Sequence, residues 1–133
     1  ELPSLSNKVL LAKEEGDFVE DPFRHEQNLI IKENGKTVLL AGCAHNGIVN
    51  IIKRCKQITG RYADVVIGGF HLLNPSTKAS ESPQLVAAIA KQLKSTGSQY
   101  FTCHCTGMTA FEQLHEVMGN KLHYLSTGSI IKI

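Results

Sequence analysis

The chain has 133 residues and a nearly balanced charge, with 14 Lys and Arg against 12 Asp and Glu and a formal net charge of +2 at pH 7. It contains neither a basic block nor interleaved aromatic residues, which argues against nucleic-acid binding, and no apolar run approaches the roughly 20 residues of a membrane span. The length predicts one domain with a real core. Because the chain opens without a leader pattern and its four cysteines lack a regular disulfide spacing, we expect a cytoplasmic protein with reduced thiols.

The amino-terminal region contains two pairs of strand patterns. Residues 8–12 and 18–19 are short apolar runs on either side of a polar turn. Residues 28–32 and 37–41 are longer β-rich runs, joined by a loop that contains Asn34-Gly35. Because these two residue types tolerate positive φ at the centre of a tight turn, the loop predicts a β-hairpin.

The second run of this hairpin leads into a strand-turn-helix unit. The turn holds Cys43, His45 and Asn46, and an apolar pattern of helical period starts at Ile48 and ends at Gly60. In an open α/β sheet such turns lie at the carboxyl ends of strands, where ligands bind. We therefore expect the free backbone N–H groups at the start of the helix, near Asn46 and Gly47, to face a phosphate or carboxylate.

A second unit repeats this layout. Residues 64–67 form an apolar strand that runs into the turn Gly68-Gly69-Phe70-His71. After a polar loop, Ser82 and Pro83 are typical of the N-cap and the first residue of a helix, which Gly97 ends. The glycine pair in the turn serves either a ligand or only a close approach of backbones.

The third unit closes the chain. Residues 100–103 form a strand that runs into His104-Cys105-Thr106-Gly107, and Thr109 with Glu112 predicts a capping box at the start of the next helix. Residues 122–124 and 129–133 are expected to be closing strands. The predicted order is a β-hairpin followed by βαβαβαβ, which is an α/β fold.

Three histidines thus follow three successive strands. If the strands are parallel neighbours, His45, His71 and His104 converge on one edge of the sheet. Convergent imidazoles are the ligands that a borderline-soft divalent metal such as Zn²⁺ prefers. The pattern predicts a metal site there.

These motifs carry a resemblance to a known family. The segments Gly42 to Asn50, Gly68 to Leu72 and His104 to Gly107, in this order and at these separations, resemble the second half of the metallo-β-lactamase superfamily. More narrowly, they are similar to the branch of metal-dependent hydrolases that includes 7,8-dihydropterin-6-methyl-4-(β-D-ribofuranosyl)aminobenzene-5′-phosphate synthase. The resemblance covers the chain from about Phe23 to the carboxyl terminus.

The resemblance implies half of a four-layered αββα sandwich. The chain, residues 1–133, would form a single domain equivalent to the carboxyl-terminal half, and it lacks the His-x-His-x-Asp-His loop of the first half. One face of its sheet would then be uncovered, which invites either pairing with the missing half or self-association as a dimer. The chain would be a fragment, a subunit of a split site or a degenerate relative.

The resemblance also implies roles for individual residues. His104 aligns with the last metal-binding histidine of the family, His45 lies where most members place a bridging aspartate, and His71 belongs to the branch's own motif. One or two divalent metals, commonly zinc, are expected. The candidate substrate-binding residues are Cys43, Asn46, Gly47, Glu26 and Thr106, with the role of Glu26 left open and Cys43 a further candidate ligand.

The chemistry implied by the family is hydrolysis by a metal-activated water. The ion lowers the pKa of its bound water from about 15.7 towards 7 and polarises the oxygen under attack. The expected substrate is a small molecule, phosphorylated in one interpretation, with phosphoester or cyclic-phosphate chemistry. Because half of the ligands are absent, we expect the isolated chain to be inactive.

Two other functions stay open. The first is a non-catalytic domain that binds a ligand or dimerises while keeping the fold. The second is a structural zinc or thiol-redox protein that uses Cys43, Cys103, His104 and Cys105, although Cys-x-Cys spacing matches the usual zinc knuckle poorly.

Overall fold

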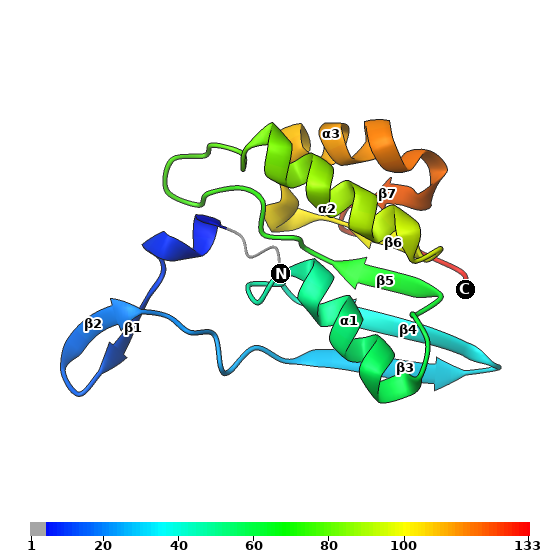
Figure 1. Ribbon diagram of the computed structural model, residues 1–133, viewed down its shortest axis with the longest axis horizontal. Helices are drawn as coiled ribbons and strands as arrows, with labels where there is room; N and C mark the ends of the chain where they lie inside the picture. Colours follow the sequence, from blue (N-terminus) through cyan, green and yellow to red (C-terminus); the bar gives the residue numbers. More distant parts are fainter. Residues whose placement is uncertain (1–4) are drawn as a thin grey trace.

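The computed structural model describes residues 5–133 and has a five-stranded sheet at its centre (Figure 1). The strands lie in sequence order, with β3 antiparallel to β4 and all later neighbours parallel. Their bounds are β3 Asn28–Glu33, β4 Lys36–Ala41, β5 Val65–Gly68, β6 Gln99–Thr102 and β7 Leu122–Tyr124. This mixed α/β architecture, with one antiparallel pair followed by parallel neighbours, confirms the predicted α/β fold class.

Three helices connect the parallel strands: α1 Ile48–Thr59, α2 Pro83–Ser95 and α3 Met108–Met118. Because each right-handed crossover moves one strand further in the same direction, all three helices cover the same face of the sheet (Figure 1). Two short 3-10 turns, η2 His104–Thr106 and η3 Gly119–Lys121, flank α3. Among residues 5–133, none of the helices has the length and hydropathy that a bilayer crossing requires.

Local sequence signals account for most of these boundaries. The β3–β4 turn has positive φ at Asn34 (48°) and Gly35 (75°), as the predicted hairpin requires. Ser82 caps α2 by accepting a hydrogen bond from the Leu85 N–H at 3.3 Å, with Pro83 as the first helical residue. Gly60 ends α1 in the left-handed conformation.

The amino-terminal region differs from the prediction. Residues 8–12 do not form one strand, because a 3-10 turn, η1 Leu5–Val9, precedes β1, which covers Leu11–Glu14. β1 pairs only with β2, Asp17–Glu20, in a small hairpin away from the main sheet (Figure 1).

Two predictions at the carboxyl-terminal end are wrong. Thr109 and Glu112 do not form a capping box, because α3 starts one residue earlier and Gly107, which has no side chain, is its N-cap. Residues 129–133 do not form a strand, because a turn closed by the Ser129 N–H and the Ser126 carbonyl at 3.0 Å leads the chain away from the sheet edge.

The core lies between the sheet and the three helices. Alternate strand residues that point to this side are fully buried, including Leu39, Val66, Tyr100 and Leu122. The Tyr100 hydroxyl is paired with Thr96 Oγ1 at 2.7 Å, so this large side chain is buried without an unsatisfied polar atom.

The opposite side of the sheet is an apolar surface without a covering helix among the described residues. We call it the open face; it comprises Leu29, Ile31, Val38, Leu40, Ile67 and Phe101, which share one side by strand register. Leu29 is 56% exposed and Ile31 38% exposed, whereas the others are half-buried. The carboxyl-terminal Ile133 helps to line a cavity of about 300 Å³ on this face, so the chain's own tail covers only part of it.

Gly68 permits the close approach of β5 to β4. A Cβ atom at this position would lie 2.2 Å from the Ala41 carbonyl oxygen, well inside van der Waals contact. The end of β5 therefore fits beside β4 only because Gly68 has no side chain.

We expect Gly68→Ala to lower the free energy of unfolding by about 1–3 kcal/mol, because the backbone of β4 has to move away from the new methyl group. Urea denaturation measures this change. Gly42→Ala is the matched control, because a Cβ there meets no atom within 4 Å, and its effect should stay within about 0.5 kcal/mol. Equal losses in the two variants would contradict the close-approach explanation.

Candidate functional site

The three β–α turns lie together at one edge of the sheet. β4, β5 and β6 are parallel neighbours, so the turns that follow them leave from the same edge. A backbone hydrogen bond from the Gly69 N–H to the Gly42 carbonyl at 2.8 Å joins the first two turns. The Leu72 N–H donates to the Cys105 carbonyl at 3.0 Å and joins the second turn to the third.

A cavity of about 500 Å³ opens between these turns. Its lining includes all three predicted histidines together with two thiols, namely His45, His71, His104, Cys43 and Cys105. Residues of the amino-terminal segment, among them Leu10, Leu11 and Phe23, form another part of the wall. The structure thus brings the three predicted histidines to a single cavity, although their role as metal ligands stays a prediction.

Backbone geometry at the turns is unusual. Ala44, His71 and His104 have φ values of 56°, 48° and 50°, which place three non-glycine residues in the left-handed region. Such residues cost on the order of 1–3 kcal/mol each and cluster at functional sites. The strain therefore falls on the same three turns that line the cavity.

His45 is held on several sides. Its ring stacks on the Phe23 ring, with centroids 4.1 Å apart and planes 1° from parallel, and it contacts the His71 ring at 4.1 Å and a 52° tilt. Its Nδ1 lies 3.1 Å from Asn7 Oδ1. Burial lowers the pKa of the His45 imidazole, against the opposite effect of the Glu26 and Asp21 carboxylates, so the neutral ring is favoured.

The carboxylate of Glu26 binds the backbone of the first turn. One oxygen accepts the His45 N–H at 2.6 Å, and the other accepts the Asn46 N–H at 3.0 Å and the Asn46 side-chain amide at 2.7 Å. These donors lie just before α1, where the sequence predicts a ligand phosphate or carboxylate. In the structure the chain's own carboxylate occupies this position.

The other two histidines differ in exposure. His71 is 3% exposed and its ring contacts the His45 ring, whereas His104 is exposed at the start of η2. The cavity therefore has one buried, one half-buried and one exposed imidazole.

The thiols of Cys103 and Cys105, at the third turn, have raised pKa values. Burial, followed by the nearby Cys43 thiol, raises the pKa of Cys105 to about 12, and the Cys105 thiol donates to the Cys43 carbonyl at 3.6 Å. Burial and Cys43 also raise the pKa of Cys103. Because a thiolate is the metal-binding and nucleophilic form, these raised pKa values disfavour Cys103 and Cys105 in that role in the protein alone.

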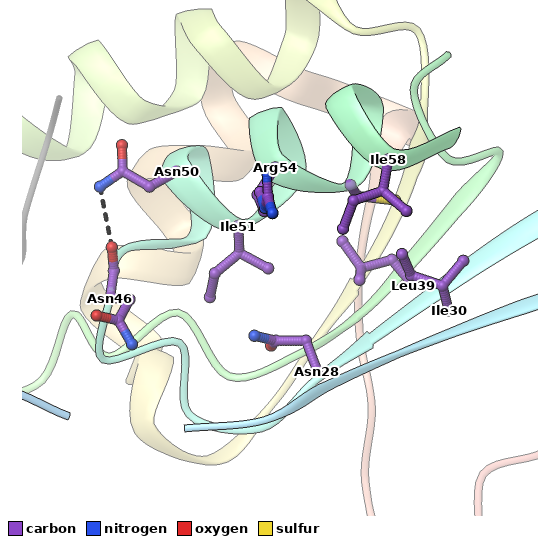
Figure 2. Close-up of a pocket in the computed structure, with 9 residues that line it drawn as sticks. Asn28, Ile30, Leu39, Asn46, Asn50, Ile51, Arg54 and Ile58 are labelled. Atoms are coloured by element: carbon purple, nitrogen blue, oxygen red, sulfur yellow. Dashed lines mark hydrogen bonds between the residues drawn. The ribbon is translucent and has the colours of Figure 1, made fainter. Parts of the chain in front are cut away.

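Thr106 and Asn46 lie outside the cavity wall. Thr106 is fully buried, and its hydroxyl accepts the Phe70 N–H at 2.9 Å and lies 2.5 Å from Thr102 Oγ1. Its contacts connect the second and third turns. Asn46 instead borders a separate, mainly apolar cavity of about 370 Å³ between α1 and strands β3 and β4, where Ile30, Leu39, Ile51 and Ile58 gather (Figure 2). None of the three histidines lines this second cavity.

The imidazole groups that line the histidine cavity are suitable ligands for a divalent metal, but too few of them lie close together to hold one. Imidazole suits zinc and related ions. Yet no group of three His, Cys, Asp or Glu side chains within residues 5–133 is placed closely enough to hold an ion. The described residues therefore supply only a partial ligand set.

Two contacts of the site were not predicted from the sequence. Asn7 and Phe23 both touch His45, from 38 and 22 residues away in the chain. Neither residue lies in a motif. The only available signal for Phe23 was its apolar side chain within an otherwise polar stretch.

Comparison with known proteins agrees with this geometry, although no family model matches the chain. The chain is 34% identical over 121 residues to the 7,8-dihydropterin-6-methyl-4-(β-D-ribofuranosyl)-aminobenzene-5′-phosphate synthase of Methanocaldococcus jannaschii, covering 90% of this chain and 39% of the synthase. It is 31% identical over 122 residues to an uncharacterized protein of the same organism, covering 90% and 41% of the two chains.

A solved structure is also similar. The crystal structure of Tm1679, a metal-dependent hydrolase of the β-lactamase superfamily, matches with a TM-score of 0.80 and 27% identity, covering 92% of this chain and 46% of that one. The chain thus spans less than half the length of each of these three relatives. By shared sequence and shared fold, the chain is similar to the metallo-β-lactamase superfamily and, within it, to the branch of the dihydropterin synthase, over the part of these relatives that it spans.

Proposed function

We propose that this chain is the carboxyl-terminal part of a metal-dependent hydrolase whose site is completed by residues outside residues 1–133. The observation that carries the proposal is the single cavity lined by His45, His71 and His104 at the carboxyl ends of β4, β5 and β6. A bound divalent metal would supply an activated water and a Lewis acid. The named hydrolase Tm1679 and the synthase relative support this class of chemistry.

The substrate that we propose is a small phosphorylated molecule. The printed name of the synthase relative contains a 5′-phosphate, which supports phosphoester or cyclic-phosphate chemistry for this chain as well. The cavity of about 500 Å³ is within the range of small-molecule sites. Lys78 on its wall supplies a positive charge of the kind that a phosphate needs.

The open face supports a missing second layer. Four of its six apolar residues, Val38, Leu40, Ile67 and Phe101, lie on the strands β4, β5 and β6 that end at the histidine cavity. Exposed apolar patches of this kind mark interaction surfaces. We propose that the other half of the sandwich covers this face in the complete protein, and that the isolated chain self-associates through it.

Zinc titration by calorimetry tests the metal site. The isolated chain should bind Zn²⁺ weakly, and His45→Ala and His104→Ala should each lower the affinity at least about tenfold, because each removes an imidazole from a partial set. His123→Ala is the control, because His123 is exposed on β7 and does not line the cavity.

Equal affinity in His45→Ala and His123→Ala would contradict the proposal. Loss of zinc in Cys43→Ala or Cys105→Ala, with zinc retained in His45→Ala, would instead support a structural thiol site. No zinc binding at neutral pH would favour a non-catalytic binding domain.

Sedimentation velocity tests the open face. The isolated chain should associate with rising concentration, and Ile31→Lys should weaken the association at least about tenfold, because a charged group would have to leave water at the contact. Ile58→Lys serves as the control, because Ile58 is 60% exposed but lies on α1, outside the open face. A chain that stays monomeric at all concentrations, or variants that behave alike, would refute the contact.

A further inference from the structure

Two polar side chains, those of Glu26 and Asn7, hold His45 in place. Glu26 binds the backbone of the turn, since its two carboxylate oxygens accept the N–H groups of His45 and Asn46 at 2.6 and 3.0 Å. The Asn46 side-chain amide also donates to Glu26, at 2.7 Å. A carboxylate that accepts three hydrogen bonds from one turn holds that turn firmly, because charge-assisted hydrogen bonds are strong.

Asn7 contacts both the backbone and the ring of His45. Its amide Nδ2 donates to the His45 carbonyl at 2.5 Å, and its Oδ1 lies 3.1 Å from His45 Nδ1. The first contact decides the orientation of the Asn7 amide, because a carbonyl oxygen only accepts and so must face the NH₂ group. Asn7 Oδ1 is therefore the atom that faces the ring.

The tautomer of His45 follows from this orientation. Because Oδ1 of an amide only accepts, the Nδ1 atom that faces it must carry the hydrogen. When the ring is neutral, as it is well above the ordinary pKa of imidazole, Nε2 then keeps its lone pair. Among the side chains of residues 7–133, none is a hydrogen-bond partner of Nε2, and His45 lines the histidine cavity.

The ring is also fixed in its plane. Phe23 stacks on one side with planes 1° from parallel, and the His71 ring lies against it at a centroid distance of 4.1 Å. Rotation of the imidazole would break the Asn7 contact and the stacking together. The ring is thus restrained in position, orientation and tautomer.

We propose that Asn7 and Glu26 are positioning residues for His45: Glu26 fixes the turn, and Asn7 selects the tautomer whose Nε2 lone pair is offered to an electrophile in the cavity. This inference rests on the proposed function for its purpose, but the arrangement is a property of the protein without metal. It gives Glu26 a role other than substrate binding. It also gives the segment around η1 a part in the site.

Nuclear magnetic resonance of the metal-free chain, with ¹⁵N-labelled histidine rings, tests the tautomer. At about pH 8, above the ordinary pKa of imidazole, His45 should show a protonated Nδ1 and an unprotonated Nε2. Asn7→Leu should convert this signature to a mixture of the two tautomers. Asn7→Asp keeps an acceptor oxygen and should retain the wild-type signature.

Each result decides the inference. A proton on Nε2 in the wild-type chain, or an unchanged signature in Asn7→Leu, overturns the role of Asn7. If Asn7→Leu fails to fold, the comparison of Asn7→Asp with the wild-type chain still decides, because loss of the protonated Nδ1 in that variant also overturns it.

Hydrogen exchange tests the part played by Glu26. Glu26→Ala should increase the exchange rates of the His45 and Asn46 amides at least about tenfold, because both lose their acceptor. Gln27→Ala is the control, because Gln27 is exposed and makes no side-chain hydrogen bond among the described residues. Unchanged rates in Glu26→Ala overturn its role. Because these measurements use no metal, their failure is distinct from a failure of zinc to bind.

Discussion

The close approach of three strand ends is the constraint on which the site depends. A Cβ at Gly68 would lie 2.2 Å from the Ala41 carbonyl oxygen, and one at Gly69 would lie 2.5 Å from the Cys105 sulfur. Without side chains at these two positions, the turns after β4, β5 and β6 come close enough to share hydrogen bonds and a cavity. A larger residue at either position would push the turns apart and so separate the histidines, although the new side chain would not touch a histidine itself. The glycine pair thus acts through the packing of backbones.

The Glu26 carboxylate takes the place of a bound anion at the start of α1. Free N–H groups before a helix attract an anion. In this chain the anion is Glu26, which lies 19 residues before His45, so the attraction is used to fix a turn. An incoming phosphate would have to compete with a tethered carboxylate for these N–H groups. A phosphorylated substrate is therefore better served by the cavity wall, where Lys78 lies, than by the helix start.

Local signals predicted the elements, whereas distant contacts decided the site. Asn34-Gly35, Gly60 and the Ser82-Pro83 pair act through their own φ values or caps, so the sequence alone was enough for the hairpin and the helix boundaries. The Thr109 cap failed because Gly107 is the N-cap of α3, and the strand at 129–133 failed because the turn at 126–129 comes before it. The spacing of the three histidines predicted their convergence through sheet topology. Asn7 and Phe23 could not be predicted, because nothing local records that the amino-terminal segment returns to His45.

Under the proposed function, a missing second half of the fold explains both the partial ligand set and the open face. Leu40 and Ile67, on the open face, lie two residues before Gly42 and one before Gly68, so the apolar surface reaches the edge at which the histidine turns begin. Packed sheets lie about 10 Å apart. A second sheet on the open face would therefore place its own edge beside the cavity, within reach of long side chains. The segment that removes this apolar surface from water would then also be positioned to supply the donors that His45, His71 and His104 lack.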